Sequence, residues 1–360
     1  MPENQPLELL GLSSGEICRQ LESWGEASFR GRQVYQALYF QRLADFSRMT
    51  TLSQPLRKKI REMASITFPK LHTLQRSLDG TIKYLFELSD GQKIESVFIP
   101  EPRRNTLCIS TQVGCALDCR FCLTALLGFS RNLAPGEIVG QILAILNHQC
   151  GEQTVPALPK PANIVLMGMG EPLLNLPHVS KALTLMSDPE GMSISLRRIT
   201  LSTVGIAPKL EELGKTPAIP KLAISLSATT NEVRNRLVPI NRKYPIEALL
   251  EACRNFPLPP RARITFEYVL IEGINDTVED ARRLVRLLAN LRAKVNLLPL
   301  NPGPLIDLKP SPPERIQRFQ EILLSKGLTA HLRKPRGADI FAACGQLHRA
   351  IGTGKVQSEI

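Results

Sequence analysis

The chain has 360 residues, of which 43% are hydrophobic and 22% are charged, an ordinary globular composition. This length is sufficient for one large domain with a smaller one beside it. The first residues show no basic region followed by an apolar one, and no window approaches roughly 18 uninterrupted apolar residues. We therefore expect neither a secretory signal nor a membrane span, and a cytoplasmic protein.

The formal net charge is +12, and most of the excess lies in the larger, C-terminal part of the chain. Residues 1–95 carry 13 Lys+Arg against 11 Asp+Glu, which leaves 32 against 22 for residues 96–360. Such a basic surface suits RNA or DNA, because neutralising phosphates releases counterions. A basic enzyme without a polyanionic partner is the alternative that charge alone leaves open.

The first part of the chain is predicted to be helical and to end in a β-hairpin. Residues 1–70 contain apolar residues at helical spacing, as in FRGRQVYQALYFQRL and LSQPLRKKIREM, and show no strand pattern. Two alternating runs follow, TIKYLFELSDG and QKIESVFIP, which meet at Asp90-Gly91. An Asp-Gly pair between alternating runs is a strong hairpin signal.

From residue 106 the pattern becomes strand, loop and helix, repeated six times. The predicted strands are 106–112, 162–168, 197–203, 221–228, 263–271 and 294–300, and helical segments follow several of them. Repeated βα units predict a parallel sheet that curls into a whole or partial barrel. The insert EQTVPALPKP is predicted to be a proline-rich surface loop.

The predicted strands carry apolar residues on one face and small polar residues on the other, because successive side chains point to opposite sides. In the first strand Leu107 and Ile109 share one face. The opposite face of this and two later strands carries Cys108, Ser110, Gln112, Thr200, Ser202, Ala223, Ser225 and Ser227. If the apolar faces lie under the helices, these side chains line a lumen suited to a polar ligand rather than the apolar filling of a closed barrel.

Four of the eight cysteines lie within CISTQVGCALDCRFC, residues 108–122. In a reducing compartment such clusters are more often metal ligands or catalytic thiols than disulfides. Cys115, Cys119 and Cys122 bring three thiolates together in the loop after the first strand. No nearby Cys or His supplies the fourth ligand that a structural zinc or a simple electron-transfer cluster needs. Three ligands leave one metal position open for an exchangeable molecule, and zinc or a fortuitous grouping is the alternative.

The segment CALDCRFC resembles the CxxxCxxC signature of radical S-adenosylmethionine (SAM) enzymes, whose three cysteines hold a 4Fe-4S cluster that chelates SAM through the fourth iron. Six ordered blocks over nearly the whole chain are similar to the RlmN/Cfr family of adenine methyltransferases: CISTQVGCALDCRFCLTALLGFSRNL, NIVLMGMGEPLLN, RRITLSTVG, RLVPINRKYP, NLLPLNP and RKPRGADIFAACGQL. The resemblance implies an α/β fold, a partial (βα)6 TIM-like barrel with a small N-terminal helical accessory domain.

The resemblance also implies a SAM site at the carboxyl ends of the strands, where parallel barrels build their sites. Cys115, Cys119 and Cys122 would ligate the cluster. Gly170 and Glu171 would bind the SAM amino group, since a carboxylate suits an ammonium and glycine permits close backbone approach; a loop glycine and a solvated acid are the alternative. The remaining implied SAM contacts are Ser202, Ser225, Leu226, Ser227 and Asn301. Ser227 departs from the His of the family, a change that matters little if the contact is made by backbone atoms.

Three further residues acquire catalytic roles from the resemblance. Cys344 would take a methyl group from one SAM, and a radical made from a second SAM would activate that methyl group to add to the adenine ring. Cys108 would resolve the resulting protein–RNA crosslink by attacking Cys344, with a transient disulfide. Glu95 would remove the ring proton, a role suited to a partly buried carboxylate. Taken singly, either cysteine would be a small buried hydrophobe and Glu95 an edge-strand acid facing water.

We expect four segments: an N-terminal helical accessory domain that binds RNA (1–75), a β-hairpin linker carrying Glu95 (76–105), the barrel core (106–345) and a C-terminal tail (346–360). In the first segment phosphate contacts and base stacking are expected from Arg30, Arg32, Tyr35, Tyr39, Arg57, Lys58, Lys59 and Arg61. Cys18, Cys150 and Cys253 match no motif and are expected to be structural.

The resemblance implies a monomeric RNA methyltransferase that makes 2-methyladenosine in the peptidyl-transferase region of 23S rRNA and at the tRNA adenosine 3′ of the anticodon. Such an enzyme would need a 4Fe-4S cluster, two SAM molecules per turnover and an electron donor such as flavodoxin. Two alternatives remain: a Cfr-type activity on carbon 8 of the same adenine, and a non-catalytic RNA-binding iron–sulfur protein.

Overall fold

The computed structural model describes residues 6–150, 162–304 and 306–348. The predicted proline-rich loop and most of the predicted C-terminal tail lie outside the described residues. Within these three ranges no helix is both long and apolar enough to cross a lipid bilayer.

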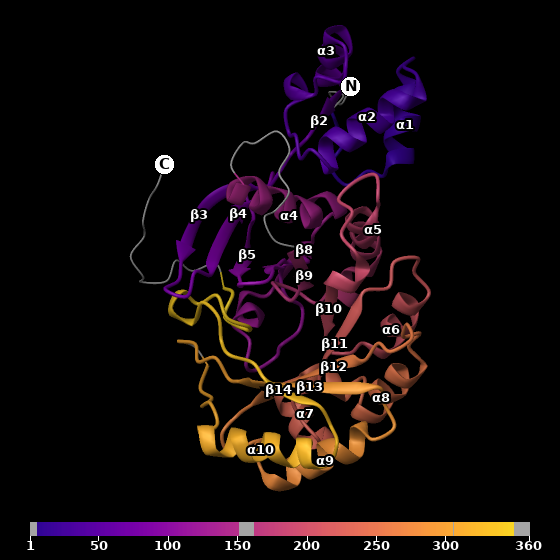
Figure 1. The fold of residues 1–360 in the computed structure, drawn as a ribbon. Coiled ribbons are helices and arrows are strands. Elements are labelled where there is room, and N and C mark those ends of the chain that lie inside the picture. The colour runs from indigo at the N-terminus through magenta and orange to yellow at the C-terminus, as the bar shows by residue number, and fades with distance from the viewer. Residues whose placement is uncertain (1–5, 151–161, 305, 349–360) are drawn as a thin grey trace.

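A ten-stranded mixed sheet forms the centre of the fold (Figure 1). Its order is β14-β13-β12-β11-β10-β9-β6-β5-β4-β3. The parallel strands are β6 (Asn105–Cys108), β9 (Ala162–Leu166), β10 (Ile199–Thr203), β11 (Lys221–Ser225), β12 (Ile264–Leu270), β13 (Ala293–Pro299) and β14 (Ala330–Leu332). The antiparallel strands are β3 (Lys70–Arg76), β4 (Ile82–Glu87) and β5 (Lys93–Pro100). The six predicted strands and the predicted hairpin are therefore confirmed, and β3 and β14 were missed.

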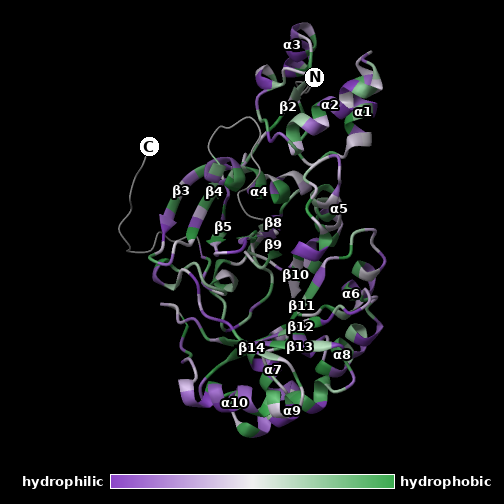
Figure 2. Cartoon of the chain, in the orientation of Figure 1, coloured by the Kyte–Doolittle hydropathy of each residue, from purple (hydrophilic) through white to green (hydrophobic). Residues whose placement is uncertain are grey.

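Helices cover the outer face of the parallel strands, as the repeated βα pattern predicts. They are α4 (Pro135–Cys150), α5 (Leu176–Ser187), α6 (Ala207–Gly214), α7 (Asn231–Leu237), α8 (Ile246–Asn255), α9 (Val278–Leu288) and α10 (Pro313–Ser325). In α9 the buried Ala281, Leu284 and Leu288 recur at helical spacing, and Figure 2 shows hydrophilic stretches beside hydrophobic ones on α9 and α10. Within the described residues β14 and β3 have free outer edges, so the expected partial barrel is confirmed.

The N-terminal region contains the expected helices, α1 (Ser14–Ser23), α2 (Ser28–Tyr39) and α3 (Gln54–Met63). It also contains a short parallel pair, β1 (Leu7–Glu8) with β2 (Ala64–Ser65). The expectation that this region has no strand is therefore wrong. A two-residue strand leaves no alternating pattern from which a sequence could predict it.

Tyr35 joins the N-terminal helices to the rest of the protein, and Tyr39 joins α2 to the segment before α1. Both side chains are at least 99% buried. The Tyr35 hydroxyl donates to Asp188 (2.8 Å) and the Tyr39 hydroxyl to the carbonyl of Leu12 (3.0 Å). Because neither ring is exposed, the predicted stacking of RNA bases on these two tyrosines is wrong.

The prediction that small polar side chains line the lumen is confirmed for Thr200, Ser202 and Ser225. It is wrong for Ser110 and Gln112, which follow the end of the first strand. Thr200, Ser202 and Ser225 line internal cavities, as alternation predicts. The first strand ends at Cys108, however, and the chain turns before β7 (Gln112–Gly114), which pairs with β8 (Phe129–Asn132). Ser110 and Gln112 are consequently buried outside the lumen, where the Ser110 hydroxyl donates to the carbonyl of Glu95 (2.6 Å).

Candidate active site

The three clustered cysteines lie in a loop that β7 and β8 close at its base. The amide of Cys115 donates to the carbonyl of Gly128 (2.9 Å), and the amide of Cys122 donates to the carbonyl of Cys119 (3.1 Å). Gly114, directly before the loop, has φ +78°, and a Cβ there would lie 1.9 Å from the Gly128 oxygen. Only glycine adopts this φ without strain and leaves room for the Gly128 oxygen, so the loop requires a glycine directly before Cys115.

All three thiols face one cavity of about 170 Å³ at the carboxyl ends of the parallel strands. Burial raises the pKa of each thiol, that of Cys115 to about 12, so binding to a metal is what would favour the thiolate form. Among the described residues no three His, Cys, Asp or Glu side chains are grouped to hold one metal ion. A tetrahedral zinc needs such a grouping, whereas an iron–sulfur cluster binds each thiolate to a different iron. Three thiols in one cavity fit an iron–sulfur cluster that leaves one iron open for an exchangeable molecule.

The remaining wall of this cavity contains most of the predicted SAM contacts. Gly170, Glu171, Ser202, Ser225 and Asn301 line it together with the cysteines. Gly170 has φ +100°, and a Cβ there would lie 2.5 Å from the Cβ of Gln112. The cavity thus has polar groups on one side and the three thiols on the other.

Glu171 is buried and ties two strand ends together. One carboxylate oxygen accepts from the amide of Leu173 (3.0 Å) and the other from the amide of Val204 (2.9 Å). Burial raises the pKa of this carboxyl to about 6, because desolvation outweighs the hydrogen bonds that favour its charged form. The alternative of a solvated acid is wrong, and both oxygens already accept backbone hydrogen bonds.

Cys108 and Cys344, 236 positions apart in the sequence, line a second, adjoining cavity of about 540 Å³. Cys344 lines both cavities and therefore stands where they meet. Its backbone carbonyl accepts from the Asn301 amide group (3.0 Å), and the next residue, Gly345, accepts from the amide of Leu123 in the cluster loop (2.7 Å). Burial and the nearby Cys344 thiol raise the pKa of Cys108. The fold therefore places the two cysteines within electrostatic reach of each other, beside the cluster loop.

Comparisons with known proteins agree with this geometry. The profile of the radical SAM superfamily matches residues 109–288, and that of the ribosomal RNA large subunit methyltransferase N-terminal domain matches residues 7–66. The dual-specificity RNA methyltransferase RlmN of Geobacter sulfurreducens is 48% identical over 341 residues, 95% of this chain and 92% of that protein. The same enzyme from Gluconobacter oxydans is 47% identical, over 94% of this chain and 84% of that protein.

A crystal structure of a radical SAM methyltransferase from Sphaerobacter thermophilus superposes with a TM-score of 0.88 at 41% identity, over 95% of this chain and 99% of that one. The chain belongs to the RlmN family of radical SAM enzymes. Membership implies a 4Fe-4S cluster and SAM, which the cavity with three thiols and five polar contacts fits.

Three residues with roles expected from the RlmN family do not line either cavity. Leu226 and Ser227 are fully buried behind the wall, and the Ser227 hydroxyl accepts from the amide of Val269 (3.4 Å). Glu95 is 1% exposed, forms an ion pair with Lys83 (3.1 Å) and accepts from the amide of His348 (2.8 Å). The alternative of an edge-strand acid facing water is wrong for Glu95, because β5 lies inside the sheet.

Two charged residues of the site were missed from the sequence. Arg234 is fully buried and donates to the carbonyls of Val204, Ser225 and Leu226, so it fixes the ends of β10 and β11. Glu267, on the lumen face of β12, lines both cavities and accepts from the Asn296 amide group (2.9 Å). The signal for Glu267 was a lone acid alternating with apolar residues in ITFEYVLI, whereas nothing in NEVRNRL marks Arg234 for burial.

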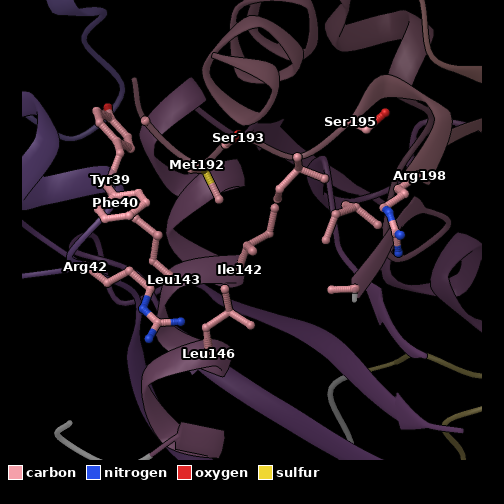
Figure 3. A pocket seen from close by; sticks show the side chains of 14 residues that line it. Tyr39, Phe40, Arg42, Ile142, Leu143, Leu146, Met192, Ser193, Ser195 and Arg198 are labelled. Carbon is pink, nitrogen blue, oxygen red and sulfur yellow. The ribbon is translucent and has the colours of Figure 1, made fainter. Parts of the chain in front are cut away.

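A third pocket, of about 370 Å³, lies between the end of α2, α4 and residues 191–198 (Figure 3). Figure 3 shows Arg42 on the side of Leu143 and Leu146, and Arg198 on the opposite side of the pocket. Tyr39, which was expected to stack on RNA, lines it, and none of the predicted cluster, SAM or catalytic residues does.

Proposed function

We propose that this chain methylates carbon 2 of adenosine in the peptidyl-transferase region of 23S rRNA and of the tRNA adenosine 3′ of the anticodon. The observation that carries the proposal is the position of Cys344 at the junction of two cavities, with Cys108 nearby in the second. The printed names of the relatives, dual-specificity RNA methyltransferases, support the two substrates. We further propose a monomer that acts in the cytoplasm and takes electrons from a protein such as flavodoxin.

The chain's own residues divide the work between the two cavities. Cys115, Cys119 and Cys122 would hold the cluster, and Gly170, Glu171, Ser202, Ser225 and Asn301 would surround SAM. When bound, the cluster and SAM supply a methyl group and, from a second SAM per turnover, the radical that activates it. Leu226 and Ser227 would support this wall from behind, consistent with a backbone role that tolerates Ser in place of His.

Cys344 would be the carrier of the methyl group and Cys108 the thiol that frees the product. Carbon 2 of adenine is electrophilic, so direct transfer of a methyl cation from SAM would fail and a protein carrier is required. The Cys108 thiolate would attack the Cys344 sulfur, so that an S–S bond forms while the electron pair of the breaking sulfur–carbon bond passes to the product carbon, which then takes up a proton. Glu95 would accept the ring proton once the segment that carries His348 moves from it.

The division of the chain is proposed on the same basis. Residues 1–75 would form the accessory domain, 76–105 the linker strands, 106–345 the radical SAM core and 346–360 the tail. The match of an N-terminal family profile to residues 7–66 supports the first boundary. The carbonyl of Leu347 accepts from Thr124 of the cluster loop (2.6 Å), which supports a tail that begins packed on the core.

Nucleoside mass spectrometry of rRNA and tRNA from a strain lacking the gene tests the proposal. We expect 2-methyladenosine to disappear from both RNAs and to return with the wild-type gene but not with Cys344→Ala. Unchanged 2-methyladenosine would contradict the proposed function, and loss of 8-methyladenosine instead would favour the Cfr-type activity. A Cys108→Ala variant should accumulate a protein–RNA adduct, whereas normal turnover without adduct would contradict the resolving role.

A further inference from the structure

The second cavity extends from Cys344 to the amino-terminal edge of the parallel strands, opposite to the cluster. Its lining includes Arg104, directly before β6, Lys221, the first residue of β11, and Lys294, the second residue of β13. Parallel strands begin at the same edge of a sheet, so these cations surround one opening. The cluster cysteines and Glu171 lie at the other edge, where the strands end. The cavity therefore has a basic mouth, formed by Arg104, Lys221 and Lys294, and Cys344 at the opposite end, which we call the floor.

The residues between the mouth and the floor are polar, and the pairing register of the strands places two of them next to the cations. Thr200 on β10 pairs with Lys221, and Thr265 on β12 pairs with Lys294. All four residues line the cavity, as does Cys108 deeper inside. A small polar corridor of this kind admits an extruded base better than an apolar side chain.

Among the cations at the mouth, Lys221 and Lys294 have no acidic partner within the described residues. Partial desolvation of its ammonium group, together with the charges of Lys294, Arg104 and Arg198, lowers the pKa of Lys221. Arg104 has an ion pair with Glu101 (2.7 Å), but no carboxylate of the described residues pairs with Lys221, Lys294 or Arg198. Lys221 and Arg198 are exposed. Lys221 and Lys294, with Arg198 near Lys221, are like charges without counter-charges, an arrangement that favours the binding of an anion.

The segment after β14 adds further cations to the lining of the cavity. Arg333, Lys334 and Arg336 line it, and only Arg336 has an ion pair among the described residues, with Asp79 at 3.4 Å. Arg336 also donates to the carbonyl of Pro100 (2.9 Å), which pairs with Asn105 at the start of β6, so this cation lies near the basic mouth.

We propose that single-stranded RNA reaches Cys344 through this basic mouth, with Lys221, Lys294 and Arg104 binding the phosphates that flank the target adenosine. The proposal rests on the proposed function for the identity of the RNA. The target base would enter the lumen with its sugar–phosphate held outside, so only an unpaired nucleotide would fit. RNA and SAM would then approach Cys344 from opposite ends of the barrel, and neither would block the other.

The experiment measures the salt dependence of RNA binding by the full-length protein, with a fluorescent anticodon stem-loop as the probe. The double variant Lys221→Gln/Lys294→Gln removes two positive charges while keeping a polar side chain at each position. The log–log slope of affinity against salt should fall by about 1.4, roughly 0.7 for each contact to a single strand. Lys209→Gln/Arg282→Gln removes two cations from the outer helices α6 and α9 and is the matched control, because both side chains lie away from the cavity.

The proposal is upheld if only the first double variant lowers the slope. It is overturned if the slope is unchanged, if the control lowers it equally, or if the wild-type protein does not bind the probe. Urea unfolding of both variants shows whether each is folded, and Lys221→Arg/Lys294→Arg should restore the slope because charge is kept. Mass analysis of the wild-type Cys344 peptide after incubation with SAM tests the proposed function separately. An unmethylated Cys344 with a lowered slope in the variant would contradict the chemistry and leave the RNA path standing.

Discussion

Replacing Gly114 by alanine should disrupt the cluster loop, and Gly91 is its matched control. Both glycines have φ +78°, so an alanine at either position meets the same backbone strain, about 1–2 kcal/mol. At Gly91 the new Cβ would meet nothing within 4 Å, whereas at Gly114 it would lie 1.9 Å from the Gly128 oxygen. Relieving that overlap shifts backbone and costs about 1–3 kcal/mol more. We expect Gly114→Ala to lower the free energy of unfolding by about 2–5 kcal/mol in total.

The Gly128 oxygen also accepts the hydrogen bond from the Cys115 amide, so the shift displaces a proposed cluster ligand. Urea unfolding of the metal-free variants measures the stability difference, and iron content after anaerobic reconstitution measures the loop. Gly91→Ala should bind iron like the wild type, and Gly114→Ala should bind substantially less. Equal stability and equal iron content in the two variants would refute the argument, because strain alone would then account for both.

Two further predictions concern ionisable groups that line the candidate site, Glu171 and Cys344. Glu171→Ala leaves the buried amides of Leu173 and Val204 without their acceptor and should cost about 2–6 kcal/mol in urea unfolding, roughly 1–3 for each amide. Glu171→Gln keeps one acceptor oxygen and should cost about half as much; a wild-type midpoint for Glu171→Ala would contradict this. Desolvation of the Cys344 thiol within the cavity and the nearby Glu267 carboxylate both oppose its thiolate and raise its pKa to about 11, although the residue as a whole is exposed. In the metal-free protein its alkylation rate, followed by peptide mass spectrometry, should therefore rise about tenfold per pH unit up to that value, and a plateau near pH 9 would contradict the assignment.

Most of the barrel could be predicted because its strands and helices carry regular local patterns. Alternation placed Thr200, Ser202 and Ser225 on the lumen face, and each lines a cavity. The same argument failed for Ser110 because it assumed that the strand continued, and a turn after Cys108 leaves no mark in the alternation. β14 was missed for a related reason, since a three-residue strand does not establish a period.

Burial of charge could not be predicted from local sequence, because it depends on partners from distant segments. Arg234 in a polar helix has the pattern of a solvated residue, but the carbonyls at the ends of β10 and β11 lie within its reach once the barrel is assembled. Tyr35 and Tyr39 were expected to stack on RNA beside basic residues, and the docking of α2 against Asp188 and Leu12 buries them instead. In each case burial depends on partners that local sequence patterns do not reveal.

The segment around Cys344 links all parts of the site. It is hydrogen-bonded to the cluster loop through Leu123 and Thr124, to the loop after β13 through Asn301, and to Glu95 through His348. A backbone movement of Cys344 would therefore change contacts at the cluster loop and at Glu95. Because Glu95 accepts the His348 amide in this structure, the movement that delivers the methyl group would also free the proposed proton acceptor. Carrier movement and base exposure would then be one event rather than two.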